Sequence, residues 1–315
     1  MRESDVLSPK EQISPEKPVS LNLSALKGGR VRNIKERFIE LFLLICAISS
    51  VLVIFLIIYF IFSQGLPFLV QVGPSFLTGS IWRPTDSFAA GTWGIFPIII
   101  GSILVTLGAI GIGTPLGVAC AVFLAELAPP YMRRILTPSI NALAGVPSVV
   151  YGFFGLIVIV PWIRDQFGGF GASVLACWII LAIMILPTVI SISQDSIRAV
   201  PREYKEGSLA LGATHWQTIR SVLLPAASSG IVASVILGMG RAIGETMAVL
   251  MVAGNTVRIP VSVTSPVSTL TAQIALEMGY ASGAHREALF AMGIVLFVII
   301  MILTGAANLA LRRRI

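Results

Sequence analysis

The chain has 315 residues, of which 56% are hydrophobic and only 12% are charged, and its formal net charge is +7. This balance excludes an ordinary soluble domain and indicates an integral membrane protein. The positive charge does not require a nucleic-acid partner, because membrane proteins collect Lys and Arg on their cytoplasmic side. We therefore expect membrane lipid, and no nucleic acid, around this chain.

The N-terminal third begins polar and then becomes strongly apolar. Residues 1–37 mix Pro, Ser, Glu and Lys without apolar periodicity, which is typical of a disordered cytoplasmic tail. The apolar stretch at 38–63 is long enough to cross a bilayer and no small-residue cleavage site follows it, so we expect it to be the first transmembrane helix. Residues 64–93, with Trp82 and Trp93, should form a periplasmic loop and a docking surface.

The rest of the chain, 94–311, is expected to be a core of five further transmembrane helices. Five apolar stretches are each long enough to span: 94–127, 140–163, 172–193, 226–253 and 288–311. Gly-Ile-Gly-Thr-Pro at 111–115 interrupts the first of them, so that helix either kinks there or runs on beyond the membrane. The fold class is thus an all-α integral membrane protein with six transmembrane helices, and seven spans is the alternative.

Basic residues set the orientation. With six spans, the N-terminus, the loops at 128–139 and 194–225 and the C-terminus share one side, which carries most of the Lys and Arg. The opposite side carries only Arg83, Arg164, Arg258 and Arg286. The positive-inside rule then predicts a multi-pass membrane protein with both termini in the cytoplasm.

Several catalytic patterns are missing from the sequence. It contains no Gly-x-x-x-x-Gly-Lys-Ser/Thr phosphate loop, and its two histidines, His215 and His285, fall on opposite predicted sides. A His-based metal site or a nucleophile–His pair therefore lacks material. We expect no metal and no cofactor in the chain itself, and no enzymatic activity.

The longest interior cytoplasmic loop, 194–225, ends in the sequence EGSLALGATHWQTIRSVLLP, from Glu206 to Pro225. Gly212 can end a first short helix in the left-handed conformation, and Thr214-x-x-Gln217 has the spacing of a capping box for a second. Pro225 would begin the fifth span. A plain connecting loop is the alternative to a functional element.

This segment resembles the EAA motif of ABC-importer permeases, E-A-A, three residues, G, nine residues, I-x-L-P. Glu206-Gly207-Ser208, Gly212 and Val222-x-Leu224-Pro225 have that spacing, with Gly207 and Ser208 in place of the two alanines. The resemblance implies that residues 203–225 dock on a cytoplasmic ATPase. It assigns this coupling contact to Glu206, Gly207, Gly212 and Pro225.

The fifth span carries two charges near membrane depth, Arg241 and Glu245, at a helical spacing that places them on one face with Gly230, Ser234 and Gly238. Charged residues inside a membrane are costly when unpaired and are functional candidates. One interpretation is an Arg–Glu ion pair that serves assembly only. The other is that Arg241 presents its guanidinium group to a permeating oxyanion while Glu245 holds that group in place.

Two segments, AGVPSVVYGFFGL at 144–156 and GRAIGETMAVLMVAGN at 240–255, resemble PstC-type permeases of phosphate ABC importers more closely than the PstA-type partners. The similarity covers about residues 90–311. It implies the type I ABC importer (MetI-like) fold and transport roles for Arg241 and Glu245, with Asn255 and Tyr151 as further pathway candidates. Helix packing around Pro147 and Gly152 is the alternative explanation for the first segment.

The same resemblance implies partners: a PstA-like permease in a heterodimer, two copies of a PstB-like ATPase and a PstS-like external phosphate-binding protein. Within the periplasmic loop 254–287, apolar residues between 268 and 278 predict a short amphipathic helix on the membrane surface or against the binding protein. We thus expect the permease of a phosphate importer. The alternatives are a permease for another oxyanion (molybdate or sulfate), a proton-coupled secondary transporter in which Glu245 carries the proton, and a non-transporting scaffold.

Overall fold

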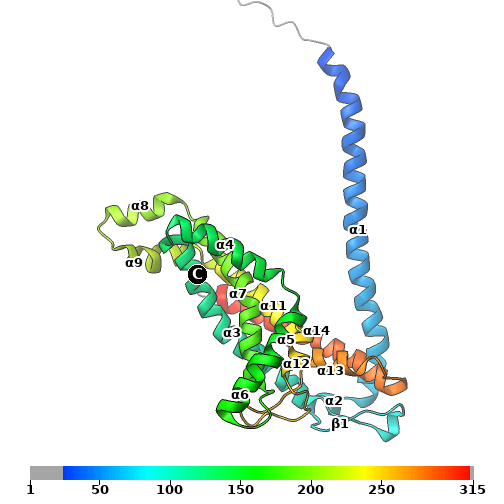
Figure 1. The fold of residues 1–315 in the computed structure, drawn as a ribbon. Coiled ribbons are helices and arrows are strands. Elements are labelled where there is room, and N and C mark those ends of the chain that lie inside the picture. Colours follow the sequence, from blue (N-terminus) through cyan, green and yellow to red (C-terminus); the bar gives the residue numbers. More distant parts are fainter. Residues whose placement is uncertain (1–23, 313–315) are drawn as a thin grey trace, which may run out of the picture. The chain divides into compact units, whose positions relative to one another are not determined.

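The computed structural model describes residues 24–312, and these residues are mainly helical (Figure 1). They divide into a first unit that ends at Ile58 and a second unit, 59–315. The helix α1 (Ser24–Val72) passes from one into the other.

The first unit consists of the N-terminal part of α1. Large apolar side chains on this part, from Phe38 to Ile57, are exposed, as a helix that faces lipid requires. The expectation of disorder up to residue 37 was wrong for 24–37, which are helical, while 1–23 lie outside the described residues. Once an apolar helix exists, each added residue gains a hydrogen bond without a new nucleation cost, so the helix extends into the polar tail.

The second unit begins with the end of the first predicted span and continues into residues 64–93, which were expected as a loop. Here α1 continues to Val72, beyond the predicted end at residue 63, and is followed by a region of short elements. That region consists of α2 (Ser75–Thr78), a 3-10 turn η1 (Phe88–Ala90), and an antiparallel pair of strands, β1 (Trp82–Arg83) and β2 (Thr92–Trp93).

The remaining elements of the second unit follow in chain order. They are α3 (Phe96–Val122) with the π turn η2 (Phe123–Leu127), α4 (Pro130–Ala144), α5 (Ser148–Phe154), the π turn η3 (Gly155–Ile159), α6 (Val160–Phe167), α7 (Val174–Arg198), α8 (Arg202–Ala210), α9 (His215–Thr218), the π turn η4 (Ile219–Leu223), α10 (Leu224–Ala226), α11 (Ser228–Gly244), α12 (Met247–Val252), α13 (Leu270–Glu277) and α14 (Gly283–Arg312).

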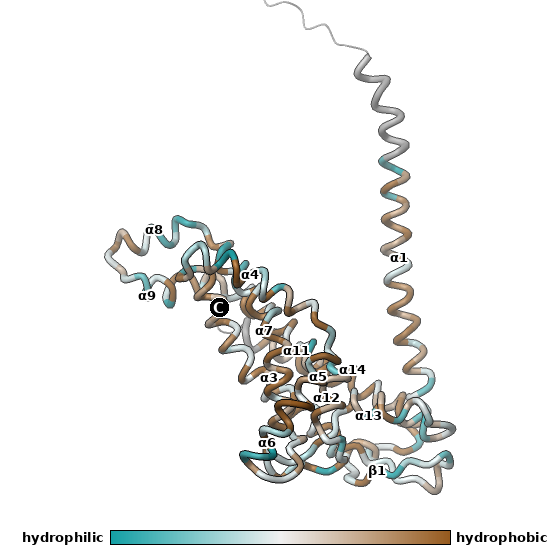
Figure 2. Tube along the Cα trace, viewed as in Figure 1, coloured by the Kyte–Doolittle hydropathy of each residue, from teal (hydrophilic) through white to brown (hydrophobic). Residues whose placement is uncertain are grey.

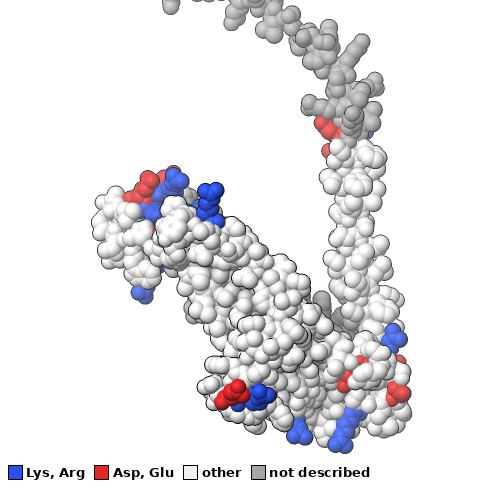
Figure 3. Space-filling view, viewed as in Figure 1, with Lys and Arg blue, Asp and Glu red and all other residues white. Residues whose placement is uncertain are grey.

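Within residues 24–312, five helices are long and apolar enough to cross a membrane, and a sixth crossing results if the bent pair 215–226 and 228–244 is one span. The all-helical six-span fold class is therefore confirmed. In the second unit, charged side chains gather at the α8 end and around α6 and β1, with an uncharged and largely apolar region between them (Figures 2 and 3). A bilayer would lie across that region.

The helices α3 and α7 form the centre of the second unit. The continuous helix Phe96–Leu127 has 32 residues and passes through Pro115 without a break. At about 1.5 Å per residue it is longer than the membrane core is thick, so it extends beyond the membrane. Gly108 lies beneath the ring of Trp178, whose Nε1 donates to the carbonyl of Leu104 at 2.9 Å. A side chain at Gly113 would meet Ile185, so small residues allow the close approach.

The third span does not begin at residue 140 as expected. Residues 130–144 form the separate helix α4, and the membrane-length helix is Ser148–Phe167. Pro147 disfavours helical geometry at Val146, which separates α4 from α5. The chain therefore breaks at Gly145–Pro147, inside the stretch predicted as one span.

The fifth span is also not one helix. A bend of 68° at Ala227 separates α10 from α11, and α11 ends at Gly244, so Glu245 lies in a break before α12. The expectation that residues 226–253 form one span was wrong, because the chain bends at Ala227 and the helix breaks at Glu245. The small residues of α11 do pack as predicted: Ser234 Oγ lies 2.8 Å from Ser193 Oγ on α7, and Gly230 lies against Ser196.

The helix α13 and the strand β2 both pack against the rest of the second unit. The helix expected between 268 and 278 exists as α13. Its face with Leu270, Gln273 and Glu277 is buried while Ala275 and Leu276 are exposed, so its place on the membrane surface or against a binding protein stays a prediction. Trp93 is buried with Phe68 and Phe76, which excludes it from a docking surface. Burial of apolar surface stabilises the fold, so these apolar side chains pack inward although they lie in segments expected as loops.

Candidate functional site

The coupling segment, residues 203–225, lies at one end of the second unit (Figure 1). Gly212 adopts φ +85, and its amide donates to the carbonyl of Leu209 at 3.0 Å, so it ends α8 in the left-handed conformation as predicted. Thr214 and Gln217 form the predicted capping box at the start of α9. Ser208 Oγ lies 3.0 Å from Thr218 Oγ1, which joins the two helices.

The tip of this segment is apolar and open. Leu211 is 91% exposed, and Tyr204, Leu209 and Trp216 are also exposed. Glu206 and Gly207 lie on the exposed surface of α8, where Glu206 makes no interaction with any other residue that the structure describes. Aromatic and apolar side chains beside an unpaired carboxylate are typical of a surface that binds another protein.

The base of the coupling segment is rigidly packed. Ile219, Leu223 and Ala227 are buried against the ends of α3 and α7, in one cluster with Ala121 and Ile197. Pro225 lies in α10, directly before the 68° bend rather than at the start of a straight span. A force on α8 and α9 would therefore reach α3, α7 and α11 through packed side chains.

The break after α11 has its own hydrogen bonds. The Glu245 carboxylate accepts from the amide of Ala248 at 3.1 Å, so it caps α12. The Glu245 carbonyl accepts from Thr271 Oγ1 on α13 at 2.9 Å. This geometry differs from the continuous helical face predicted for the fifth span, because Glu245 has extended backbone and its side chain is committed to the next helix.

Arg241 lies on the last turn of α11 and is partly buried. Among the residues that the structure describes, it makes no hydrogen bond or ion pair, and the expected pair with Glu245 is absent. A guanidinium group cannot lose its charge in a protein, so it needs water, a partner subunit or an anion. Arg241 is the group in this span available to an anionic ligand.

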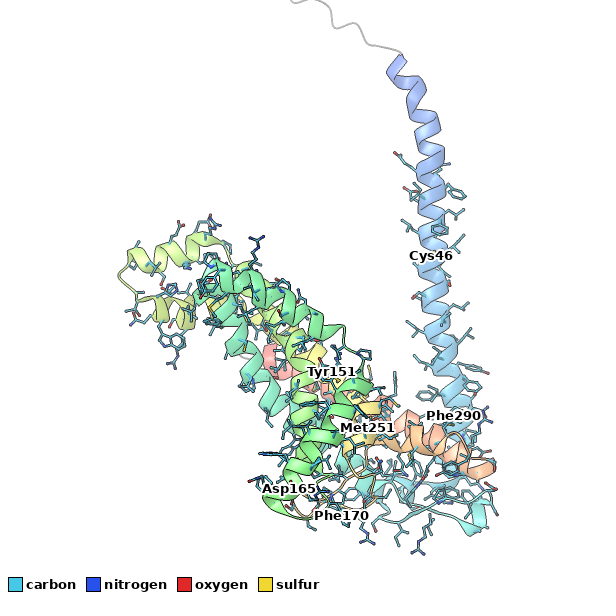
Figure 4. All side chains as sticks on the ribbon, viewed as in Figure 1. Cys46, Tyr151, Asp165, Phe170, Met251 and Phe290 are labelled. Carbon is cyan, nitrogen blue, oxygen red and sulfur yellow. The ribbon has the colours of Figure 1, made fainter. Side chains whose placement is uncertain are left out.

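Tyr151 lies on α5 and Asn255 follows the end of α12, and these two helices pack together. Gly152 is in contact with Ala248, and Figure 4 shows Tyr151 and Met251 on these neighbouring helices. The Tyr151 hydroxyl donates to the carbonyl of Leu143 at 2.8 Å, which holds α4 against α5. This bond favours the packing explanation for Tyr151.

Asn255 has φ +46, the only positive φ of a non-glycine residue in the described part of the chain. Its Nδ2 donates to the carbonyl of Leu250 at 2.8 Å, so it closes the end of α12. Its Oδ1 is buried without a partner. Asn tolerates the left-handed region better than most residues, which accounts for its place after Gly254.

A buried polar network supports α13, and sequence reasoning missed it. Glu277 accepts from Trp82 Nε1 at 3.1 Å and from Gln273 Nε2 at 2.7 Å, and its Oε2 lies 2.9 Å from His285 Nε2. Burial and then the Glu277 carboxylate raise the pKa of the nearby Tyr280 phenol. The sequence signal was the isolated histidine, but its partners are far away in the chain.

Metal chemistry finds no support in the described residues. No group of three or more His, Cys, Asp or Glu side chains in that part of the chain could hold a metal ion. The His285–Glu277 contact is a pair only.

Comparison with known proteins identifies the family. Residues 113–315 match the family described as "Binding-protein-dependent transport system inner membrane component". The probable ABC transporter permease protein YqgH of Bacillus subtilis is 46% identical, covering 80% of this chain and 83% of that protein. The phosphate transport system permease protein PstC of Haemophilus influenzae is 36% identical, covering 73% and 78%.

The fold agrees with this match. A chain of the MetNI methionine ABC transporter, solved in inward facing conformations, aligns with a TM-score of 0.54 at 20% identity, covering 68% of this chain and 92% of that one. At that identity the likeness shows the fold alone. The family match over most of the second unit, together with this fold, establishes that the chain belongs to the binding-protein-dependent transport system inner membrane components.

Proposed function

We propose that this chain is the phosphate-translocating permease subunit of an ATP-driven importer in the inner membrane, with both termini in the cytoplasm. The observation that carries the proposal is Arg241, a partly buried guanidinium that has no partner among the described residues and lies on the span that the coupling segment enters. A planar fork of N–H donors matches the oxygens of phosphate. The name of the Haemophilus influenzae relative, a phosphate transport permease, supports phosphate as the cargo.

The partners follow from the two ends of the second unit. The exposed tip around Leu211 and Trp216 would enter a groove of a PstB-like ATPase, present in two copies. A PstA-like permease would complete the pathway in a heterodimer, and a PstS-like binding protein would deliver phosphate on the external side. The family description, which names binding-protein-dependent transport, supports such a delivery protein.

The proposed cycle transmits motion through the bent fifth span. Closure of the ATPases moves α8 and α9, and the packed base around Ile219 and Leu223 carries this motion into α3, α7 and α11. Arg241 then changes its access from one side of the membrane to the other. Glu245 positions the break by capping α12 instead of holding the guanidinium, so Arg241 is free to bind and release the anion.

A reconstituted importer tests this proposal. The chain would be assembled in proteoliposomes with its genomic-neighbour permease, ATPase and binding protein, and uptake of labelled phosphate, sulfate and molybdate would be measured. We expect ATP-dependent uptake of phosphate that continues after the proton gradient is collapsed. Preferential uptake of sulfate or molybdate, or uptake that needs the proton gradient and not ATP, would reject the proposal.

A further inference from the structure

A cavity of about 570 Å³ lies at the base of the coupling segment, and we call it the basal cavity. It opens between the end of α7, the start of α8 and the turn η2 that follows α3. Its ionisable lining residues are Arg133, Arg198, Arg202, Lys205, Glu126 and Glu206. Figure 3 shows the charged side chains gathered at this end of the second unit.

The charges in the basal cavity do not cancel. Lys205 Nζ lies 2.5 Å from Glu126 Oε2, so these two groups neutralise each other. Three arginines then face one remaining carboxylate, Glu206. Neither Arg202 nor Glu206 interacts with another residue in the described part of the chain. The cavity therefore holds an excess of positive charge that residues 24–312 leave unbalanced.

Two of the arginines are held in place by neutral acceptors. Arg133 Nη2 donates to the carbonyl of Ala125 at 3.0 Å, while its Nε is buried without a partner. Arg198 Nη2 donates to the carbonyl of Leu124 at 3.4 Å. With its amide oxygen turned toward that guanidinium, Gln194 accepts from Nη1 and Nη2 of Arg198 at 2.9 and 2.7 Å. Carbonyl and amide oxygens orient a guanidinium group but do not neutralise it.

Oriented cations around a cavity are a preorganised anion site, because the cost of ordering the side chains has been met before the ligand arrives. Guanidinium groups favour oxyanions over simple halides since they donate paired N–H bonds. We propose that the basal cavity binds a phosphate group, either as inorganic phosphate or as part of a phospholipid headgroup. The site is separate from Arg241 and goes beyond the proposed transport role.

Occupation of this site would connect three elements. Arg133 belongs to α4, Arg198 ends α7 and Arg202 begins α8, so one bound anion would bridge the coupling segment to two helices of the core. The anion would restrain α8 relative to α7 across Ala199–Pro201. It would thereby set how firmly α8 is held when the ATPase pushes on it.

Arg202→Gln is the first test, because Arg202 is exposed and unpaired, so its loss should not disturb the fold. Binding of labelled inorganic phosphate would be measured by equilibrium dialysis on the assembled importer, without binding protein, in neutral-lipid nanodiscs. We expect roughly a tenfold or greater loss of affinity, as removal of one charge-assisted contact predicts. Arg134→Gln is the matched control, since Arg134 adjoins Arg133 but does not line the cavity, and it should bind as wild type.

The Arg241→Gln background separates the two phosphate sites. Binding that depends on Arg202 should persist there even if transport is lost, and Arg198→Gln should weaken it as well. If all phosphate binding disappears with Arg241→Gln and none depends on Arg202, the basal cavity is not a phosphate site and the proposal fails.

Native mass spectrometry in the presence of an anionic phospholipid identifies the source of the phosphate group. If the wild type retains that lipid, the lipid displaces inorganic phosphate and Arg202→Gln loses the lipid, the headgroup is supported as the occupant. If inorganic phosphate binds and the lipid does not compete with it, the free ion is supported as the occupant. If Arg202→Gln alters neither ligand but weakens ATPase association, the arginines serve acidic side chains of the partner and the proposal is overturned.

Discussion

The coupling segment and the broken fifth span are both needed for the proposed function, but they are stabilised in different ways. In the coupling segment, the turn between α8 and α9 is set by bonds between near neighbours in the chain, such as Thr214 with Gln217, while the ion pair of Lys205 with Glu126 attaches α8 to the core. In the fifth span, the break at Glu245 is supported from α13 by Thr271, which comes from a distant part of the sequence. Local bonds specify a shape that survives alone, whereas long-range bonds make the shape of the span depend on the whole fold.

The largest expected effect belongs to Glu277→Ala, which tests the long-range contacts that support the broken fifth span. The partly buried Trp82 and the buried Gln273 and His285 would lose their acceptor, and the free energy of unfolding should fall by about 3 kcal/mol. Unfolding in detergent would measure the loss, with the exposed Glu287→Ala as control. Amide exchange should accelerate in α12 and α13 while α8 and α9 are unchanged; equal acceleration in both regions would contradict the distinction.

Gly212→Ala tests the coupling segment with the next largest effect. A side chain at φ +85 costs about 1–2 kcal/mol, so the turn between α8 and α9 should rearrange and ATPase association should weaken. Gly305→Ala is a matched control, because Gly305 lies inside α14, away from the coupling segment, with open space around it, and alanine favours helix there. Pull-down of the ATPase compares the two; equal binding by both variants would remove Gly212 from the docking geometry.

Thr214→Ala should destabilise α9 by about 1 kcal/mol, because the capping box loses its side-chain acceptor. Amide exchange at Gln217 would report the change, and Thr214→Ser should preserve protection. The α12 amides should not respond. A response there would show that the two regions are less independent than their hydrogen bonds indicate.

The smallest expected effect belongs to Thr271→Val, at about 0.6 kcal/mol, a typical value for a hydrogen bond between helices in a membrane protein. The change removes the donor to the Glu245 carbonyl and nearly preserves volume. Faster amide exchange at Met247 and Ala248 with Thr271→Val, but not with Thr271→Ser, would confirm that α13 holds the break. Identical exchange in both variants would reject this role.

The same distinction explains what the sequence could predict. Gly212 and the Thr214–Gln217 box were identified correctly because each depends on residues within one or two turns, and the small residues of α11 were identified because a helical face of small residues is visible in the sequence without its partner on α7. The break at Glu245, the buried face of α13 and the Glu277 network were missed, since they are set by contacts between residues far apart in the chain. The helix extension into 24–37 was missed for another reason: composition reports mean polarity and not the ease of extending an existing helix.

The site residues divide in the same way. Arg241 and Glu245 were chosen from their charge in an apolar span, a signal that needs no tertiary information. Their relation to each other could not be predicted, because an i to i+4 pair assumes an unbroken helix, and Glu245 instead caps α12. The basal cavity could not be predicted at all, as its arginines come from three helices.

ATP-driven phosphate uptake by the Arg241→Gln importer tests the central claim most directly. The exchange removes the charge and leaves a polar side chain of related shape, and ATPase pull-down would establish that the complex still assembles. We predict that phosphate uptake is abolished while assembly and ATPase docking are retained. Normal phosphate uptake by this assembled variant would contradict the account.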